Sequence, residues 1–340
     1  MLPSPPNTPM QPDAFLSSEA DTRRPLIHHI NADNSWLLQI PRPGPRPYFN
    51  ILMDVWLQGP QIEFSKIFHS QSHTEASTFQ TVKEIEDFVR QIENHALNLR
   101  GEIAGERPAG YIDAATCTIK GTDHCNEQTL RQLHPSVPVF TRPDAAKLVN
   151  SWKHFETVVT VREFEGNWRE THAAPLPDWI GIGLLTQKSS DIQGIHKGVI
   201  ISFDIGAGCE AVVQLPHGIP ADHLGFIASA EPRVRVLALI HGLLNVKVGF
   251  ALTGYMDANL GGHNGLQLQR LLNADYWIGT HDEDKDAHGL TSWLLSFNRI
   301  TLQQALEQER EQLGKEGKGS AKQEPPKFHS LSNGSSMVLV

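Results

Sequence analysis

The stretch from Tyr111 to Trp152 constrains the fold of this chain more than any other part of the sequence. It opens with β-branched and small residues, which are typical of a buried strand, and Asp123-His124 stands in the polar loop that follows. The pattern predicts, in order, a strand, a polar loop, a helix ended by Pro135, a second strand and a second helix with Pro in its first turn, at 112–119, 120–126, 127–134, 137–140 and 143–152. This is an α/β layout with reactive residues at the carboxyl end of a strand.

The Asp123-His124 pair and the Val-Pro-Val-Phe strand after it resemble the metallo-β-lactamase fold superfamily, most closely the branch of ascorbate-6-phosphate-lactonase-like and fungal uncharacterised proteins. The metal motif of that family is His-x-His-x-Asp-His. The six matching positions here read Ile-Lys-Gly-Thr-Asp-His, from Ile119 to His124, so both early histidines are absent. The resemblance implies a four-layer αββα sandwich of two mixed sheets with helices on the outer faces.

The composition predicts one folded domain with polar ends. Residues 1–25 are rich in Pro and Ser and are expected to be disordered, residues 26–313 form the metallo-β-lactamase-like domain, and residues 314–340 read as a flexible tail of Lys, Gly, Ser and Pro. Over 340 residues, 39% are hydrophobic and 20% are charged, which is an ordinary globular composition.

The net charge and the cysteine pattern limit which binding partners and which cellular compartment are expected. The formal net charge of −9 argues against nucleic acid as a partner, since a phosphate-binding face needs a basic excess. No apolar run approaches the length of a membrane span, and Met1–Pro12 lacks the apolar core of a secretory signal. Three widely spaced cysteines fit reduced thiols. We therefore expect a cytoplasmic protein with a small-molecule substrate.

The resemblance also implies a set of metal ligands. The family has two half-sites, and the first falls here on Ile119 and Gly121, which cannot bind a metal. The second falls on Asp123, His124 and His281, where His281 follows an apolar strand and faces an acidic loop. One carboxylate and two imidazoles make an open three-ligand site for one zinc ion, or for iron or manganese, with water in the fourth position.

Three further residues are candidates for supporting roles. Asp54 ends a strand and is expected to orient the metal loop, or it is an ordinary loop-capping carboxylate. His217, at another strand end, is a candidate ligand or general base, or it only caps a turn. His263 has the same candidate roles and lies in a Gly-rich turn that opens a helix, where it alternatively belongs only to the first helical turn.

Two functions of different classes follow. The first is a metal-dependent hydrolase of a small ester, lactone or phosphoester with a mononuclear site. The second is a catalytically inactive binding or scaffolding protein that has kept the fold. The retained half-site favours the hydrolase, and the loss of two motif histidines favours the inactive protein. The sequence has no Gly-x-Ser-x-Gly, Walker A or Gly-x-Gly-x-x-Gly signature of another catalytic class.

Overall fold

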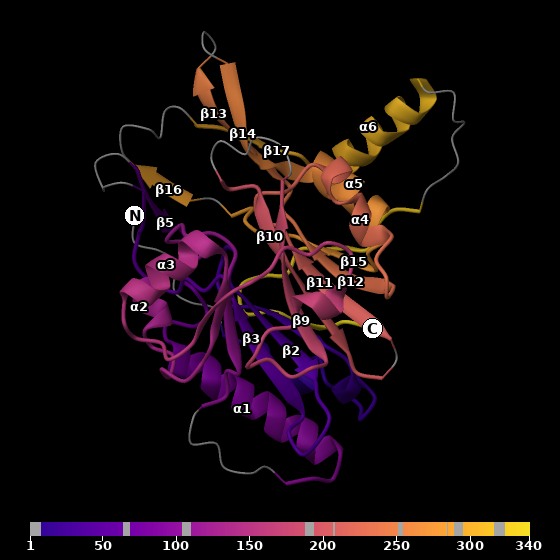
Figure 1. Cartoon of the computed structure of the whole chain (residues 1–340). Coiled ribbons are helices and arrows are strands. Elements are labelled where there is room, and N and C mark those ends of the chain that lie inside the picture. The colour runs from indigo at the N-terminus through magenta and orange to yellow at the C-terminus, as the bar shows by residue number, and fades with distance from the viewer. Residues whose placement is uncertain are drawn as a thin grey trace.

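Two large mixed sheets face each other in the computed structural model, and helices cover their outer faces (Figure 1). The model describes residues 8–63, 69–103, 110–187, 194–206, 208–250, 254–283, 285–288, 295–315 and 324–340. This architecture is the four-layer αββα sandwich that the sequence predicts.

The first sheet has seven strands and comes mainly from the N-terminal half. Its spatial order is β19 (Ser336–Val338), β1 (Leu26–His29), β2 (Trp36–Pro41), β3 (Tyr48–Met53), β6 (Ala114–Cys117), β7 (Val139–Thr141) and β8 (Val158–Thr160). The pairs from β19 to β3 are antiparallel, whereas those from β3 to β8 are parallel. The parallel strands therefore end at one common edge.

The second sheet has six strands. Its order is β18 (Phe328–His329), β15 (Tyr276–Ile278), β12 (Val234–Ile240), β11 (Cys209–Gln214), β10 (Lys197–Asp204) and β9 (Ile180–Thr186). The pairs from β18 to β11 are parallel, and those from β11 to β9 are antiparallel. This sheet thus also collects several carboxyl strand ends at one edge.

Two small sheets stand beyond the sandwich, and one of them, β14–β13–β17, projects at the top of Figure 1. The first consists of β14 (Gly254–Leu260), β13 (Leu244–Phe250) and β17 (Leu295–Arg299). The second consists of β16 (Lys285–His288), β5 (His69–His73) and β4 (Gln61–Glu63). The α-helices are α1 (Val82–Leu99), α2 (Glu127–Leu130), α3 (Pro143–Ser151), α4 (Gly225–Ala228), α5 (Gly261–Leu272) and α6 (Leu302–Lys315). The short 3₁₀ helices are η1 (Pro12–Ala14), η2 (Asp21–Arg23), η3 (Trp168–Thr171) and η4 (Ala221–His223). None of the described helices is long and apolar enough to cross a membrane.

Alternation along the strands divides the apolar core into layers. In β2, Leu37 packs in the core under α1, whereas Leu38 faces the space between the two sheets. In β10, Ile201 faces the same inter-sheet core and Ile200 faces the layer that includes α5. Successive side chains of a strand point to opposite faces of its sheet. Each sheet therefore contributes apolar side chains both to the core between the sheets and to the layer under its outer helices.

Helix α1 covers the outer face of the first sheet. Its apolar residues recur at helical spacing and are buried, and they are Val82, Ile85, Phe88, Val89, Ile92, Ala96 and Leu97. Thr81 caps the helix through the amide of Glu84, whose carboxylate binds the Thr81 amide in return. This reciprocal cap fixes where the helix begins, as the amphipathic pattern predicts.

The two ends of the chain differ from the expected disordered and flexible segments. In the N-terminal segment, Leu16 is fully buried. In the C-terminal segment, β19 pairs with β1 and β18 pairs with β15, so the tail adds a strand to each sheet. The polar composition of the tail gives no sign of these strands, because they are only two and three residues long. Their pairing partners are edge strands formed elsewhere in the chain.

We expect Leu339→Ala to destabilise the fold. Leu339 is fully buried between the sheets, so the truncation leaves a cavity and should cost about 2–5 kcal/mol in the free energy of unfolding. Val340→Ala is the matched control, since Val340 is 58% exposed and its truncation should change stability by less than about 0.5 kcal/mol. Urea denaturation measures both, and equal stabilities of the two variants would contradict the C-terminal packing described here.

Candidate metal centre

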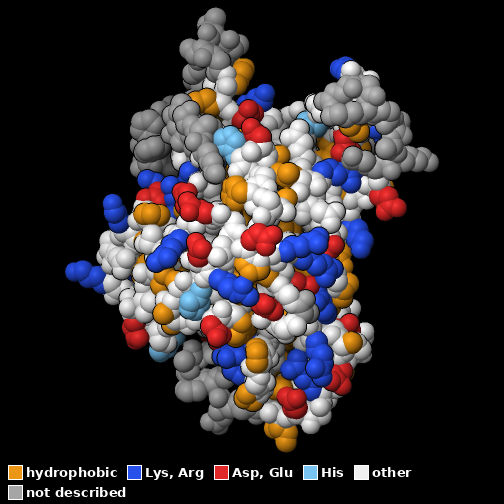
Figure 2. Space-filling view, turned by 45° about the vertical axis from the view of Figure 1, so that its right-hand side comes forward, with side chains coloured by type: hydrophobic (Ala, Val, Ile, Leu, Met, Phe, Trp, Pro, Cys, Tyr) orange, Lys and Arg blue, Asp and Glu red, His pale blue; other side chains and the backbone are white. Residues whose placement is uncertain are grey.

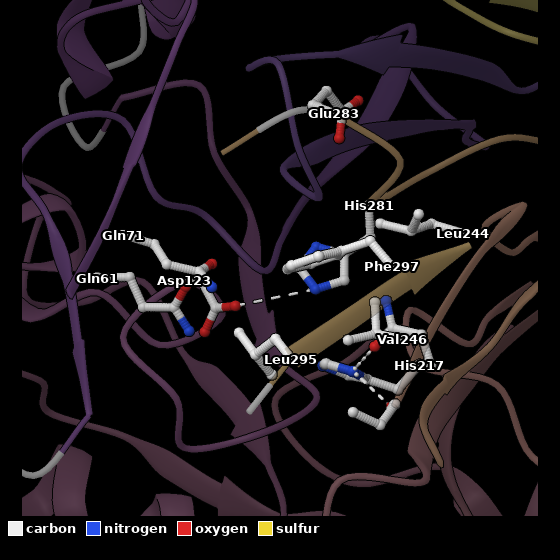
Figure 3. Close-up of a pocket in the computed structure, with 12 residues that line it drawn as sticks. Gln61, Gln71, Asp123, His217, Leu244, Val246, His281, Glu283, Leu295 and Phe297 are labelled. Carbon is white, nitrogen blue, oxygen red and sulfur yellow. Dashed lines mark hydrogen bonds and ion pairs between the residues drawn. The ribbon is translucent and has the colours of Figure 1, made fainter. Parts of the chain in front are cut away.

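Three histidines converge at the edge where strands of both large sheets end. His124 lies in the loop after β6, His217 follows β11, and His281 follows β15. The Nε2 atoms of His124 and His217 are 3.2 Å apart, and one ring nitrogen from each of the three lies within 4.8 Å of the others. Parallel strands place their carboxyl ends at one edge, which brings His124 and His281 together although they are more than 150 positions apart in sequence. Figure 3 shows His217 beside His281.

Asp123 adds a carboxylate to the three imidazoles. Its Oδ2 atom is 3.5 Å from Nε2 of His124 and 4.0 Å from Nε2 of His281, the pair joined by a dashed line in Figure 3. The three ligands expected from sequence therefore lie together, and His217 lies with them.

Each of these imidazoles is held through its other nitrogen. Nδ1 of His124 is 2.9 Å from Oδ2 of Asp54, and Nδ1 of His281 is 2.5 Å from Oδ1 of Asp33. Nδ1 of His217 is 2.7 Å from the side-chain oxygen of Asn259. An ionised carboxylate and an amide oxygen only accept hydrogen bonds, so each Nδ1 donates. The three Nε2 atoms that meet at the centre are thereby oriented in the way that protein metal sites use.

Asp54 is fully buried and lies where an orienting residue is required. Besides His124, it accepts hydrogen bonds from the amide and the hydroxyl of Thr118, at 2.7 and 2.6 Å. The side-chain amides of Asn34 and Gln214 donate to it at 2.8 and 3.2 Å. These donors hold the carboxylate in one orientation, which fixes the ring of His124.

Backbone strain is concentrated at the same place. Asp54 has φ of 47° and His281 has φ of 58°, both in the left-handed region that residues other than glycine rarely adopt. Such conformations cost of order 1–3 kcal/mol each and persist where the surrounding contacts determine them. Here they turn one anchoring carboxylate and one imidazole toward the centre.

The charge balance of the centre favours a cation. Asp33, Asp54 and Asp123 are all buried around the three imidazoles. Burial disfavours the charged form of His124, but Asp123 and then Asp54 outweigh this and raise the pKa of His124 to about 9. Burial, followed by the proximity of His281 and His124, lowers the pKa of His217. The three buried carboxylates favour positive charge at the centre, and a cation among the Nε2 atoms would provide it.

A second group of potential ligands, Asp33, Asp123 and His281, shares two members with the first. Because Asp33 already accepts the Nδ1–H of His281, it acts as an anchor of that ring. The two candidate groups therefore overlap in space.

His263 lies apart from this centre. It stands in the first turn of α5 and lines a different cavity together with Asp222, Lys247 and Asp257. The β14–β13–β17 sheet separates the two cavities, because alternate residues of its strands line one or the other. The structure does not bring His263 to the three imidazoles.

Sequence reasoning missed two anchoring residues, Asp33 and Asn259. Asp33 precedes the first strand of a hairpin and is separated from His281 by 248 positions. Asn259 is the next-to-last residue of β14, a strand that the sequence patterns do not predict. An Asp or Asn beside a strand is too common in proteins to be singled out, so only the spatial pairing with a histidine identifies them.

A cavity of about 470 Å³ opens above the centre, with Asp123, His217 and His281 at its base. Strands β13 and β17 contribute an apolar wall of Leu244, Val246, Leu295 and Phe297. Gln61 and Gln71 lie on the other side, as Figure 3 shows. The volume suits a small organic molecule.

Comparisons with known proteins identify the fold. No family model and no curated protein matches the sequence. Among solved structures, an isothiocyanate hydrolase from Delia radicum gut bacteria is similar over 92% of this chain and 98% of its own, with a TM-score of 0.54 and 15% identity. A possible metal-dependent hydrolase from Veillonella parvula is similar over 93% of this chain and 100% of its own, with a TM-score of 0.52 and 13% identity.

A third structure extends the likeness. Igni18, a metallo hydrolase from the archaeon Ignicoccus hospitalis, is similar over 93% of this chain and 99% of its own, with a TM-score of 0.50 and 13% identity. At these identities the likeness concerns the fold, and it spans nearly the whole of each chain. Together with the two stacked sheets and their outer helices, it shows that this chain has the metallo-β-lactamase fold that its sequence resembles.

Proposed function

We propose that the protein is a metal-dependent hydrolase that acts on a small, uncharged ester or lactone at a single metal ion. The observation that carries this proposal is the convergence of three Nε2 atoms and one carboxylate, with every Nδ1 held by a hydrogen-bond acceptor. Asp123, His124 and His281 are the proposed ligands, and Nε2 of His217 is close enough to join them. Imidazole and carboxylate donors suit zinc first, and iron or manganese as alternatives.

Asp123, His124 and His281 would hold the ion, which when bound would polarise the carbonyl group of the substrate. Asp54 and Asp33 restrain the rings of His124 and His281 through hydrogen bonds. Ile119 and Gly121 stand where the family has its first two ligands, and neither offers a donor atom. One ion per chain is therefore the proposed stoichiometry.

The lining of the cavity favours an uncharged substrate. Of the described residues that line it, Asp123 and Glu283 are acidic and none is a lysine or arginine. A phosphoester would bring its negative charge next to these carboxylates without a cationic side chain to bind it. An ester or lactone with an apolar group, in contrast, can place that group on the wall of β13 and β17.

The alternative, an inactive binding protein with this fold, differs in one observable. It would bind a ligand in the same cavity without turnover, whether or not the ion is present. Metal content alone therefore cannot decide between the two, and turnover has to be measured on protein whose metal content is known.

We expect about one transition-metal ion per chain in the purified protein. His124→Ala removes a ligand and should abolish binding, whereas His263→Ala, the matched control, should leave the metal content unchanged because His263 lines the other cavity. Elemental analysis by mass spectrometry measures both. Two ions per chain, or an unchanged content in His124→Ala, would contradict the assignment.

Asp33→Asn should weaken zinc binding by about 10–100-fold, because it removes the charged anchor of the His281 ring. Asp222→Asn changes a carboxylate in the other cavity and should have no effect. Competition with a chromogenic zinc chelator gives both affinities. Equal affinities in the two variants would mean that Asp33 does not orient a ligand.

Metal-loaded protein should hydrolyse p-nitrophenyl butyrate or a γ-lactone. The kcat/KM for p-nitrophenyl phosphate should be at least about tenfold lower, because the cavity lining is acidic. Chelation and His124→Ala should each abolish the activity, while His263→Ala should retain it. Metal-loaded protein that turns over none of these neutral substrates would favour the inactive alternative. Preference for the phosphate ester would overturn the substrate class but not the hydrolase.

A further inference from the structure

A second cleft, of about 540 Å³, lies at the opposite edge of the sheets from the metal centre. Its walls come from the segment before β1, the β2–β3 hairpin, the C-terminal end of α1 and the β10–β11 hairpin. Strand β2 runs from one region to the other. At one end, Trp36 donates a hydrogen bond to Thr280, the neighbour of His281. At the other end, Pro41 lines the cleft. Six extended residues span about 17–20 Å, so the cleft is separate from the centre.

Arginines dominate this cleft. Arg23, Arg24, Arg42 and Arg100 line it, and Glu102 is the only acidic residue among its described lining residues. The chain as a whole carries a formal net charge of −9, so the local excess of arginine runs against the overall balance. On the face that Figure 2 shows, Lys and Arg side chains are interspersed with acidic ones, as expected for a chain with a net negative charge.

Two of the four guanidinium groups have carboxylate partners. Arg24 is 3.0 Å from Glu210, and Arg23 is 2.6 Å from Glu19 in a pair that is exposed on both sides. Exposed pairs of this kind contribute little to stability and open readily for a ligand.

The other two, Arg42 and Arg100, form no direct ion pair with a carboxylate among the described residues, and Asp113 and Glu19 act on them only from a longer distance. Arg100 donates to the hydroxyl and the carbonyl oxygen of Thr22, which holds its side chain in place without neutralising it. Arg42 lies 6.0 Å from the ring centroid of Phe49. Burial, and then the nearby Arg46, lower the pKa of Arg42, and Asp113 opposes them with a smaller contribution. Asp113 is already bound by Arg46, so an anion in the cleft would be the direct partner of the Arg42 guanidinium group.

The rest of the lining is apolar or small. Pro41, Pro43 and Ile205 supply apolar surface, and Gly44 and Gly206 both have positive φ, which suits them to the two hairpin turns. The cleft therefore combines planar guanidinium donors with a surface for a non-polar group, and its volume lies in the range of small-molecule sites.

We infer that this cleft binds a small organic phosphate, with the phosphate group on Arg42 and Arg100 and the organic part against Pro41, Pro43 and Ile205. Guanidinium groups bind phosphate through paired, charge-assisted hydrogen bonds. The apolar contacts add affinity that inorganic phosphate cannot gain. The site is independent of the proposed hydrolase function because none of its described residues lines the cavity of the metal centre.

Isothermal titration calorimetry of the full chain with AMP, inorganic phosphate and adenosine tests this inference. AMP should bind at least about tenfold more tightly than either of the other two, because only AMP offers both parts of the ligand. Arg42→Gln and Arg100→Gln should each weaken AMP binding by at least about tenfold, since each removes a charged hydrogen-bond donor. Arg42→Lys, which keeps the charge and the fold, should weaken it less than Arg42→Gln.

The matched control is Arg90→Gln, an exposed arginine on α1 that pairs with Asp87 and lies outside the cleft. It should bind AMP as the unaltered protein does. Absence of AMP binding, equal affinity for AMP and phosphate, or an equal loss in Arg90→Gln would overturn the inference. Binding that is lost in His124→Ala but kept in Arg42→Gln would assign AMP to the metal centre and overturn it as well.

Discussion

The buried carboxylate of Asp54 is the contact on which the arrangement of the centre depends. It accepts hydrogen bonds from His124 and Thr118 in the loop after β6, from Asn34 before β2, and from Gln214 on β11 of the other sheet. One side chain thus joins both sheets at the edge where the histidines meet. Without it, several buried donors would lose their acceptor at once, at a cost of about 1–3 kcal/mol for each unsatisfied group.

The same edge explains how a reduced ligand set can still make a centre. The metallo-β-lactamase fold collects carboxyl strand ends from two sheets, so donors can come from the loops after β6, β11 and β15 without a continuous motif. His217 occupies space next to His124 although Ile119 and Gly121 lack donor atoms. The left-handed backbone of His281 completes the set from the second sheet.

The two edges of the sandwich have opposite electrostatic character. At one edge, Asp33, Asp54 and Asp123 create a demand for a cation. At the other, Arg42 and Arg100 line a cleft and form no direct ion pair with a carboxylate among the described residues, which suits an anion. Strand β2 runs from one edge to the other, so the two proposed ligands would lie at opposite ends of the same strand.

Sequence patterns by themselves determined the local elements and the local part of the centre. The amphipathic run of α1, the strand before Asp123-His124 and the strand before His281 could be predicted because burial periodicity and chain breaks act over a few residues. The tertiary structure alone decided the pairing of Asp33 with His281, the approach of Asn259 to His217, the tail strands β18 and β19, and the joining of Arg42 with Arg100. Each of these depends on contacts between distant segments, whose positions follow from how the two sheets stack and not from any pattern in the neighbouring residues.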